Sequence, residues 1–182
     1  MTQHNNPFAR LPEVPQFSLV SETIADGQPL PTDQYSGAFG VPGGRDISPH
    51  LAWTGAPEGT KSYAVTAYDP GAPTGSGFWH WAVANIPATV TSLSAGAGDA
   101  DSTTIPAGAF QLPNDARLAR FIGAAPPAGH GAHRYYFTVH ALDVDHIDVQ
   151  PDATPAYLGF VMASHILARA TLIATAEIGA DA

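Results

Sequence analysis

The order of apolar and polar positions along the chain is typical of a protein built mainly from strands. Side chains alternate in character over several stretches, as they do when successive residues of a strand point to opposite faces. This pattern predicts strands over residues 17–21, 51–53, 62–69, 78–86 and 133–143. The segments between them are rich in Gly, Pro, Asp and Ser, which is typical of turns and loops.

A different pattern begins at Thr154. Threonine is a good N-cap, and the proline that follows it fits the first position of a helix. The next residues are rich in alanine and contain no proline before Gly179, which can end a helix. We therefore predict a C-terminal helix over about residues 155–178, packed on a mainly β core.

The length of 182 residues suits a single domain, residues 1–182, and we find no internal repeat and no linker. Residues 1–16 show little pattern and are predicted to form an N-terminal arm over the surface. Few charged residues and many scattered glycines and prolines favour a mainly β fold over a helix bundle. Because the chain contains no cysteine, a disulfide framework and thiolate chemistry are excluded.

The chain is acidic, with a net charge of -9 and only seven Lys and Arg residues. This balance argues against nucleic-acid binding and against general attraction to anionic membranes. Any anion must therefore be bound by local geometry. The N-terminal segment has no basic stretch followed by an apolar run, and no segment reads as a transmembrane span. We predict a cytoplasmic protein.

Two loops rich in Gly and Pro lead into strands that carry histidine. The first loop follows Asp69 and leads to His80, and the second leads to His133 and Tyr135, which share one strand face. Glycines in such loops let backbone N–H groups form concavities that bind anions. Together these segments predict a pocket with one acid, two imidazoles and one phenol, which suits an anionic head group and contains no obvious nucleophile.

The same residues also have structural interpretations. Asp69 precedes a proline, and an acid at such a position is often a turn former. His80 lies between two tryptophans on an apolar strand, where a histidine is often a satisfied core residue. Strict alternation predicts Trp79 and Trp81 in the core on the face opposite His80.

Three neighbouring polar residues are not assigned to the pocket. His130 lies in a glycine-rich turn and is predicted to be exposed to solvent. His140 falls on the strand face opposite His133 and is predicted to be structural. Arg134 also points away from His133, and we expect it to make a structural ion pair.

The chain carries four motifs in order: Asp69-Pro70-Gly71-Ala72-Pro73, Gly77-Phe78-Trp79-His80-Trp81, Gly123-Ala124-Ala125-Pro126-Pro127-Ala128-Gly129, and His133-Arg134-Tyr135. Together they resemble the motifs of the phosphatidylethanolamine-binding protein family, also called the Raf kinase inhibitor protein family, and its bacterial branch in particular. The resemblance runs from about Phe17 to the predicted C-terminal helix. An upstream block from Asp46 to Pro49 is similar to a conserved block of that family.

The resemblance implies a β-sandwich of two antiparallel sheets with short peripheral helices. It implies a pocket at one end that binds phosphate-type anions such as phosphoethanolamine and uses no cofactor. Carried over position by position, the pocket residues are Asp69, Pro73, His80, Ala125, Pro126, His133 and Tyr135. The resemblance also implies a homodimer and a regulatory or inhibitory role toward a kinase or a protease.

Two positions depart from the family pattern. Gly71 stands where the family usually has a second acid, so one negative charge is missing from the mouth of the pocket. This change should ease the entry of an anion. Ala125 stands where animal members have glycine, and its methyl group narrows the rim.

An enzyme is the alternative function. Asp69, His80 and His133 are the residue types of a two-histidine, one-carboxylate metal site, or of an acid/base pair for hydrolysis. However, the chain lacks His-x-His, His-Glu-x-x-His and Gly-x-Ser-x-Gly motifs. We therefore predict a binding protein that is not an enzyme and holds no metal.

Overall fold

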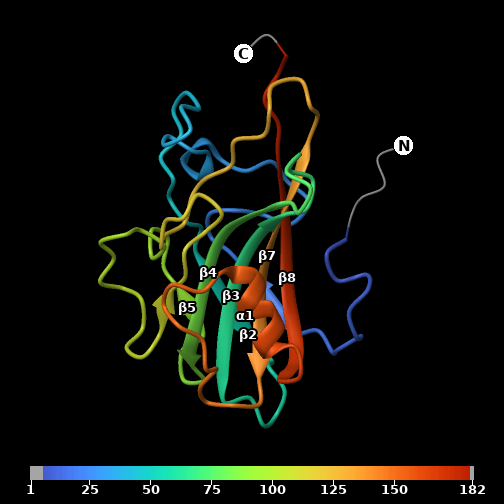
Figure 1. Ribbon diagram of the computed structural model, residues 1–182, viewed down its shortest axis with the longest axis vertical. Helices are drawn as coiled ribbons and strands as arrows, with labels where there is room; N and C mark the ends of the chain where they lie inside the picture. Colours follow the sequence, from blue (N-terminus) through green and yellow to red (C-terminus); the bar gives the residue numbers. More distant parts are fainter. Residues whose placement is uncertain (1–5, 181–182) are drawn as a thin grey trace.

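The computed structural model describes residues 6–180, which form two antiparallel sheets and one α-helix (Figure 1). The larger sheet has the strand order β6-β4-β3-β7-β8, and the smaller sheet has the order β1-β2-β5. The larger sheet comprises β3 (Ser62–Asp69), β4 (Phe78–Pro87), β6 (Phe110–Gln111), β7 (His133–Leu142) and β8 (Ile166–Ala176). The smaller sheet comprises β1 (Ser18–Val20), β2 (Leu51–Thr54) and β5 (Ser92–Leu93), and the helices are η1 (Thr32–Gln34, a 3₁₀ turn) and α1 (Pro155–Met162). The predicted fold of two antiparallel sheets is confirmed.

The main apolar core lies between the two sheets. Trp53 from β2 and Leu93 from β5 are buried there against the inner face of the larger sheet. That face contributes side chains at alternate positions of its strands, which include Val65, Val83 and Phe137. The alternation predicted from the sequence thus reflects a sheet with one face turned to this core.

A second apolar cluster lies on the other face of the larger sheet. Leu158 and Met162 of α1 pack there with alanines of β3 and β4 and with Ile147 from the loop before the helix. Figure 1 shows α1 lying across this face. The larger sheet is therefore the middle layer of the molecule, between the smaller sheet and α1.

The predicted C-terminal helix over residues 155–178 is correct only for its first two turns. The Thr154 side chain accepts a hydrogen bond from the Tyr157 N–H at 3.1 Å, as expected of an N-cap. The helix then ends at Met162, and residues 166–176 form strand β8, antiparallel to β7. Alanine favours helices, but here it alternates with larger and β-branched residues, and pairing with β7 outweighs the local propensity.

Two segments that precede β2 cover the outer edge of β8. Arg169 of β8 donates its backbone N–H to the Pro15 carbonyl at 3.0 Å and accepts from the Phe17 N–H at 3.2 Å. Further along, Thr175 donates to the Gln28 carbonyl at 2.9 Å. The described part of the predicted N-terminal arm is thus tethered to the sheet, whereas residues 1–5 lie outside the described residues. Across residues 6–180, no helix has the length and apolar character that crossing a bilayer requires.

Candidate functional site

Three strand ends meet at one edge of the larger sheet, and each brings a predicted site residue. Because β3 is antiparallel to both β4 and β7, its last residue, Asp69, lies beside the first residues of its two neighbours. His80 is the third residue of β4, and His133 is the first of β7. These ends open into a cavity of about 240 Å³. Its lining comprises all seven predicted residues, Asp69, Pro73, His80, Ala125, Pro126, His133 and Tyr135, together with Phe39, Ala72, Thr74, Phe78 and Pro127.

A β-bulge turns His80 toward this cavity. The register of β4 against β3 shifts between Trp79 and Trp81, so that His80 is the extra residue. The prediction that His80 and Trp81 lie on opposite faces is therefore wrong, because both face the side of the main core. Trp79 turns to the other face, where its ring centroid lies 4.2 Å from that of Tyr68. Without the bulge, His80 would point away from Asp69.

His80 is buried and oriented by the loop that follows β6. Its Nδ1–H donates to the Ile122 carbonyl at 2.9 Å. Burial lowers the pKa of His80, although this hydrogen bond and the negative charge of Asp69 partly oppose the shift. The ring is therefore neutral near pH 7, and the lone pair of its Nε2 is available to accept a hydrogen bond.

His133 lies in the middle of a chain of three polar side chains. Its Nδ1 donates to Asp69 Oδ2 at 2.7 Å, and its Nε2 lies 2.7 Å from Nδ1 of His130. The second carboxylate oxygen of Asp69 accepts the Gly71 N–H at 2.7 Å, so Asp69 is a turn former and a pocket residue at once. His130 is exposed as predicted, but its contact with His133 was not predicted from the sequence. The sequence feature that indicates this contact is the His-x-x-His spacing across a tight turn.

Tyr135 adds a hydroxyl group to the cavity wall. Its ring centroid lies 5.1 Å from that of His80. Burial, and then the negative charge of Asp69, raise the pKa of the Tyr135 phenol, so it stays protonated. The cavity thus presents a phenol donor and an imidazole acceptor, and it gains positive charge only when a histidine is protonated.

Comparison with known proteins identifies the family. The model of the family described as phosphatidylethanolamine-binding protein matches residues 20–177. The chain belongs to the phosphatidylethanolamine-binding protein family. It is 49% identical to the UPF0098 protein YbcL of Escherichia coli over 162 residues, which are 89% of this chain and 85% of YbcL. It is 47% identical to E. coli YbhB over 158 residues, which are 87% of this chain and 98% of YbhB.

Solved structures of this family have the same fold. The crystal structure of E. coli YbcL, described as a new member of the mammalian PEBP family, superimposes with a TM-score of 0.86 at 46% identity. That match covers 90% of this chain and 99% of YbcL. A Chlamydia trachomatis structure described as a putative phosphatidylethanolamine-binding protein homologue matches with a TM-score of 0.72 at 29% identity, over 88% of this chain and 96% of that one.

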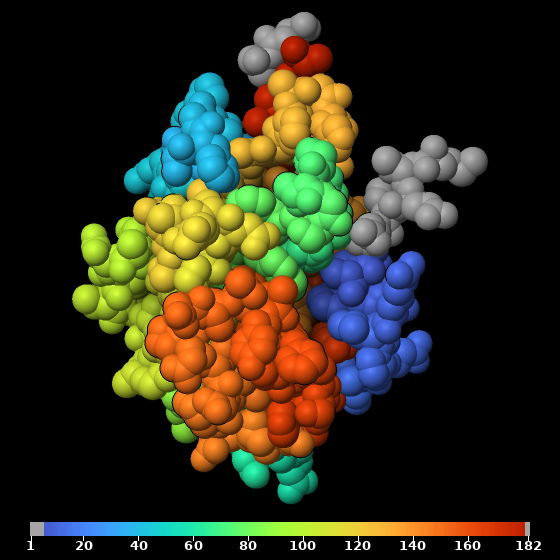
Figure 2. Space-filling view, in the orientation of Figure 1, coloured from blue at the N-terminus to red at the C-terminus, as the bar shows by residue number. Residues whose placement is uncertain are grey.

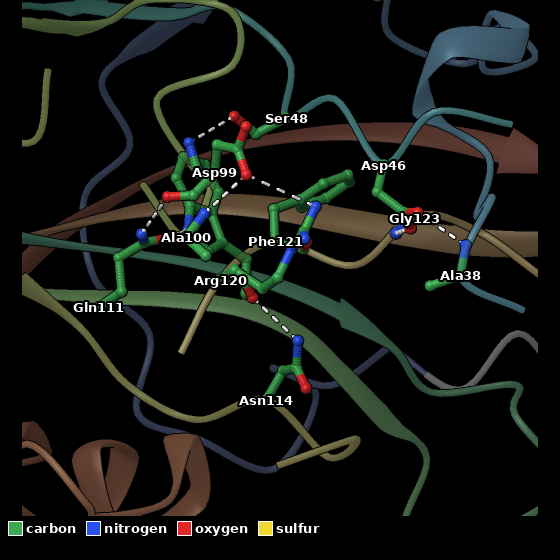
Figure 3. Close-up of polar contacts among 12 residues, drawn as sticks. Ala38, Asp46, Ser48, Asp99, Ala100, Gln111, Asn114, Arg120, Phe121 and Gly123 are labelled. Atoms are coloured by element: carbon green, nitrogen blue, oxygen red, sulfur yellow. Dashed lines mark hydrogen bonds and ion pairs between the residues drawn. The ribbon is translucent and has the colours of Figure 1, made fainter. Parts of the chain in front are cut away.

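A buried carboxylate holds together two loops at the rim of this cavity. Asp46 accepts the Gly123 N–H at 2.7 Å with one oxygen and the Ala38 N–H at 2.9 Å with the other (Figure 3). The first bond fixes the loop that carries Ala125, and the second fixes the loop that carries Phe39. The sequence placed Asp46 in a family-like block but did not connect it with the pocket.

The segment that leads to the Gly123 loop is fixed by a separate set of bonds. Gly98 donates its N–H to Ser48 Oγ at 2.8 Å and accepts from the Phe121 N–H at 2.7 Å. The Asn114 side chain donates to the Arg120 carbonyl at 2.8 Å (Figure 3). These bonds position Ile122, whose carbonyl orients His80.

The remaining polar residues named from the sequence lie outside the cavity. His140 lies on the strand face opposite His133, as predicted, and contacts Thr66 there. The predicted ion pair of Arg134 is not found with any residue between 6 and 180. Within the same range, no group of three or more His, Cys, Asp or Glu side chains is arranged to hold a metal ion.

Proposed function

We propose that this protein binds a small phosphate-type anion, such as a phosphoethanolamine head group, in the cavity beside Asp69, and that it is not an enzyme. The observation that carries the proposal is the convergence of a phenol, two imidazoles and one acid on a single cavity of about 240 Å³. Each carboxylate oxygen of Asp69 already accepts one hydrogen bond within the protein, from His133 or from the Gly71 N–H, so the anion meets an acid that is held by its own donors.

The hydrogen-bonding pattern favours an anion that brings a proton. The Nδ1–H of His80 donates to the Ile122 carbonyl, which leaves Nε2 to accept a hydrogen bond from a ligand hydroxyl. Tyr135 donates its hydroxyl to a second ligand oxygen. A phosphate monoester in its monoanionic form offers both groups at once, one P–OH and free oxygens.

The first test of the proposal is Tyr135→Phe, which removes one hydroxyl and keeps the ring. We expect the affinity for phosphoethanolamine and inorganic phosphate to fall about tenfold, the usual effect of losing a hydrogen bond to a charged group. Isothermal titration calorimetry measures the change. Tyr157→Phe on α1 makes the same chemical change at an exposed site and should leave the affinity unaltered. Equal affinities for the two variants would reject the proposed site.

The affinity is expected to rise as the pH falls from 8 to 5.5. The hydrogen bond between His80 Nε2 and the ligand requires one proton, and because burial lowers the pKa of His80, the ligand must carry that proton. The phosphate monoester itself gains its proton near a pKa of about 6. Titrations at several pH values, and at pH 7 in two buffers of different ionisation enthalpy, measure the proton taken up. A flat affinity over this pH range contradicts the mechanism.

Gly71→Asp is expected to weaken anion binding about tenfold relative to Gly71→Ala, through charge repulsion. A Cβ atom at Gly71 would lie 3.2 Å from Asp69 Oδ1 and 3.6 Å from His133 Nδ1. A carboxylate there would add unpaired negative charge to the pocket mouth, whereas alanine tests the added methyl alone. The same titration compares both variants, and identical affinities would place the anion elsewhere.

The chain Asp69–His133–His130 also supports a second candidate, acid/base hydrolysis. The nearest hydroxyl in the lining other than Tyr135 belongs to Thr74, and it donates to the Gly77 carbonyl instead of to a histidine. We therefore favour binding. Hydrolysis of p-nitrophenyl phosphate or p-nitrophenyl acetate that is lost in His133→Ala would favour the enzyme.

The family supports a regulatory role in which the anion belongs to a phosphorylated partner such as a kinase or protease, and it supports a homodimer. The regulatory role and the homodimer are both proposed from membership of the family. Pull-down with the wild type and with a His80→Ala/His133→Ala variant tests the first, since a pocket-dependent partner would be lost. Light scattering coupled to gel filtration tests the second.

A further inference from the structure

A second and larger cavity lies on the outer face of the larger sheet, between the N-terminal arm and α1. Its volume is about 890 Å³, at the upper end of the range for small-molecule sites. Figure 2 shows a furrow there between the arm, in blue, and the orange segment that contains α1. The loop after β3 separates this groove from the anion pocket, because Pro70 lines the groove and Pro73 lines the pocket.

The walls of the groove are apolar and largely aromatic. They include Phe8, Tyr68, Trp79, Tyr136, Met162 and Ile166. The bulge that turns His80 to the pocket also places Trp79 in this wall, where its ring packs at a tilt against that of Tyr68. Such walls suit the hydrocarbon or aromatic part of a ligand.

The charge of the groove is opposite to that of the whole chain. The chain has sixteen Asp and Glu residues against seven Lys and Arg. Yet Arg10 and Arg169 both line the groove, and none of its described lining residues is an Asp or Glu. The groove is therefore a local site for negative charge in an acidic protein.

Arg169 is a buried cation without a carboxylate partner. The residue is 8% exposed, and no carboxylate of residues 6–180 forms an ion pair with it. Its Nη1 donates to the Pro12 carbonyl at 3.4 Å, and its Cζ lies 5.2 Å from the centroid of the Phe8 ring. Its Nε is buried without a hydrogen-bond partner among the described residues. An anion bound at the Nε edge of the guanidinium would offset the cost of burying the positive charge of Arg169.

His140 lies beside Arg169 on the neighbouring strand and supplies a second unpaired nitrogen. The two residues are direct partners in the pairing of β7 with β8. His140 is 3% exposed, its Nε2 lies 3.1 Å from Thr66 Oγ1, and its Nδ1 has no partner among residues 6–180. Burial, and then the positive charge of Arg169, lower the pKa of His140 to about 3, so the ring is neutral. When Thr66 donates to Nε2, the Nδ1–H is free to donate to an anion.

We propose that this groove binds an amphipathic carboxylate, a molecule with a hydrocarbon or aromatic body and one carboxylate group. The carboxylate lies on Arg169 and His140, where the planar guanidinium offers two parallel N–H donors. The apolar body lies against Phe8, Trp79 and Met162. The site is separate from the anion pocket and does not depend on the function proposed for it.

Dodecanoate, kept below its critical micelle concentration, is the probe that tests the proposal. We expect it to bind to the full chain in isothermal titration calorimetry, and dodecan-1-ol, which lacks the charge, to bind at least about tenfold more weakly. Arg169→Gln should weaken dodecanoate binding by a similar factor. Arg134→Gln removes the same charge from the same face of the sheet outside the groove and should have no effect. Phe8→Ala, on the arm, is a second variant that removes an apolar contact without touching a strand.

The location of the ligand is tested by fluorescence. Trp53 and Trp81 are buried in the core, whereas Trp79 lines the groove. We expect 12-bromododecanoate to quench the fluorescence of the wild type, and Trp79→Phe to abolish that quenching. The proposal is overturned if dodecanoate does not bind, if folded Arg169→Gln and Phe8→Ala variants bind it as the wild type does, or if quenching persists in Trp79→Phe.

Discussion

Replacing Gly123 by alanine is expected to lower the free energy of unfolding by about 3 kcal/mol or more. A Cβ atom at this position would lie 2.4 Å from the carbonyl carbon of Tyr35 and 2.6 Å from the carbonyl oxygen of Gln34. Both neighbours are backbone atoms, so no side-chain rotation relieves the contact. The two chain segments would have to separate, which breaks the bond from the Ala124 N–H to the Gln34 carbonyl at 2.9 Å.

Urea denaturation at equilibrium measures this effect. Gly159→Ala is the matched control, because a Cβ atom there meets nothing within 4 Å. Gly159 lies inside α1, so this change should raise the free energy of unfolding by about 0.5–1 kcal/mol. A Gly123→Ala protein as stable as the wild type would mean that the two backbones do not approach each other as described.

Replacing Asp46 by alanine is expected to cost about 3 kcal/mol of unfolding free energy. The carboxylate is buried, and each of its oxygens accepts one backbone N–H, from Gly123 and from Ala38. Alanine leaves both donors without this partner. Asp46→Asn should cost about 2 kcal/mol, since its amide nitrogen would face one of the two N–H groups.

Asp33→Ala provides the control for Asp46. Asp33 pairs with Arg45 at 3.3 Å, but both side chains are at least half exposed, so its loss should cost less than about 0.5 kcal/mol. Thermal or urea denaturation compares the variants. If Asp46→Ala and Asp33→Ala are equally stable, Asp46 does not tie the rim loops together. Titration of phosphoethanolamine into folded Asp46→Asn then shows whether the rim affects binding.

Three strands of the larger sheet, β3, β4 and β7, were predictable because one side of that sheet faces the main core. Residues 62–69 alternate in the sequence and form β3 with the same limits. The helix predicted for the C-terminal segment was wrong for a physical reason. Alanine at alternate positions of β8 is small enough to pack under the smaller sheet, yet alanine also favours helices. Local composition does not reveal that β7 offers a strand to pair with.

The candidate site was predictable by residue type but not by geometry. Motifs that resemble a known family identified Asp69, His80 and His133, and the structure brings them together. The alternation of side chains predicted the strand that carries His80, but it could not predict the bulge that turns His80 toward the cavity. The contribution of His130 depends on a turn, and that of Asp46 on two loops distant in sequence, so neither follows a periodic pattern.

The coverage of β8 by the segments around Pro15 and Gln28 determines how the molecule behaves toward its own copies. A strand at the border of a sheet carries a row of backbone donors and acceptors that can recruit a strand from another molecule. Here the outward backbone groups of Arg169, Ile173 and Thr175 are already bonded to earlier segments of the same chain. Proteolysis within the first thirty residues would release them, and the shortened protein would be open to self-association by sheet extension, which leads to domain-swapped oligomers and fibrous aggregates.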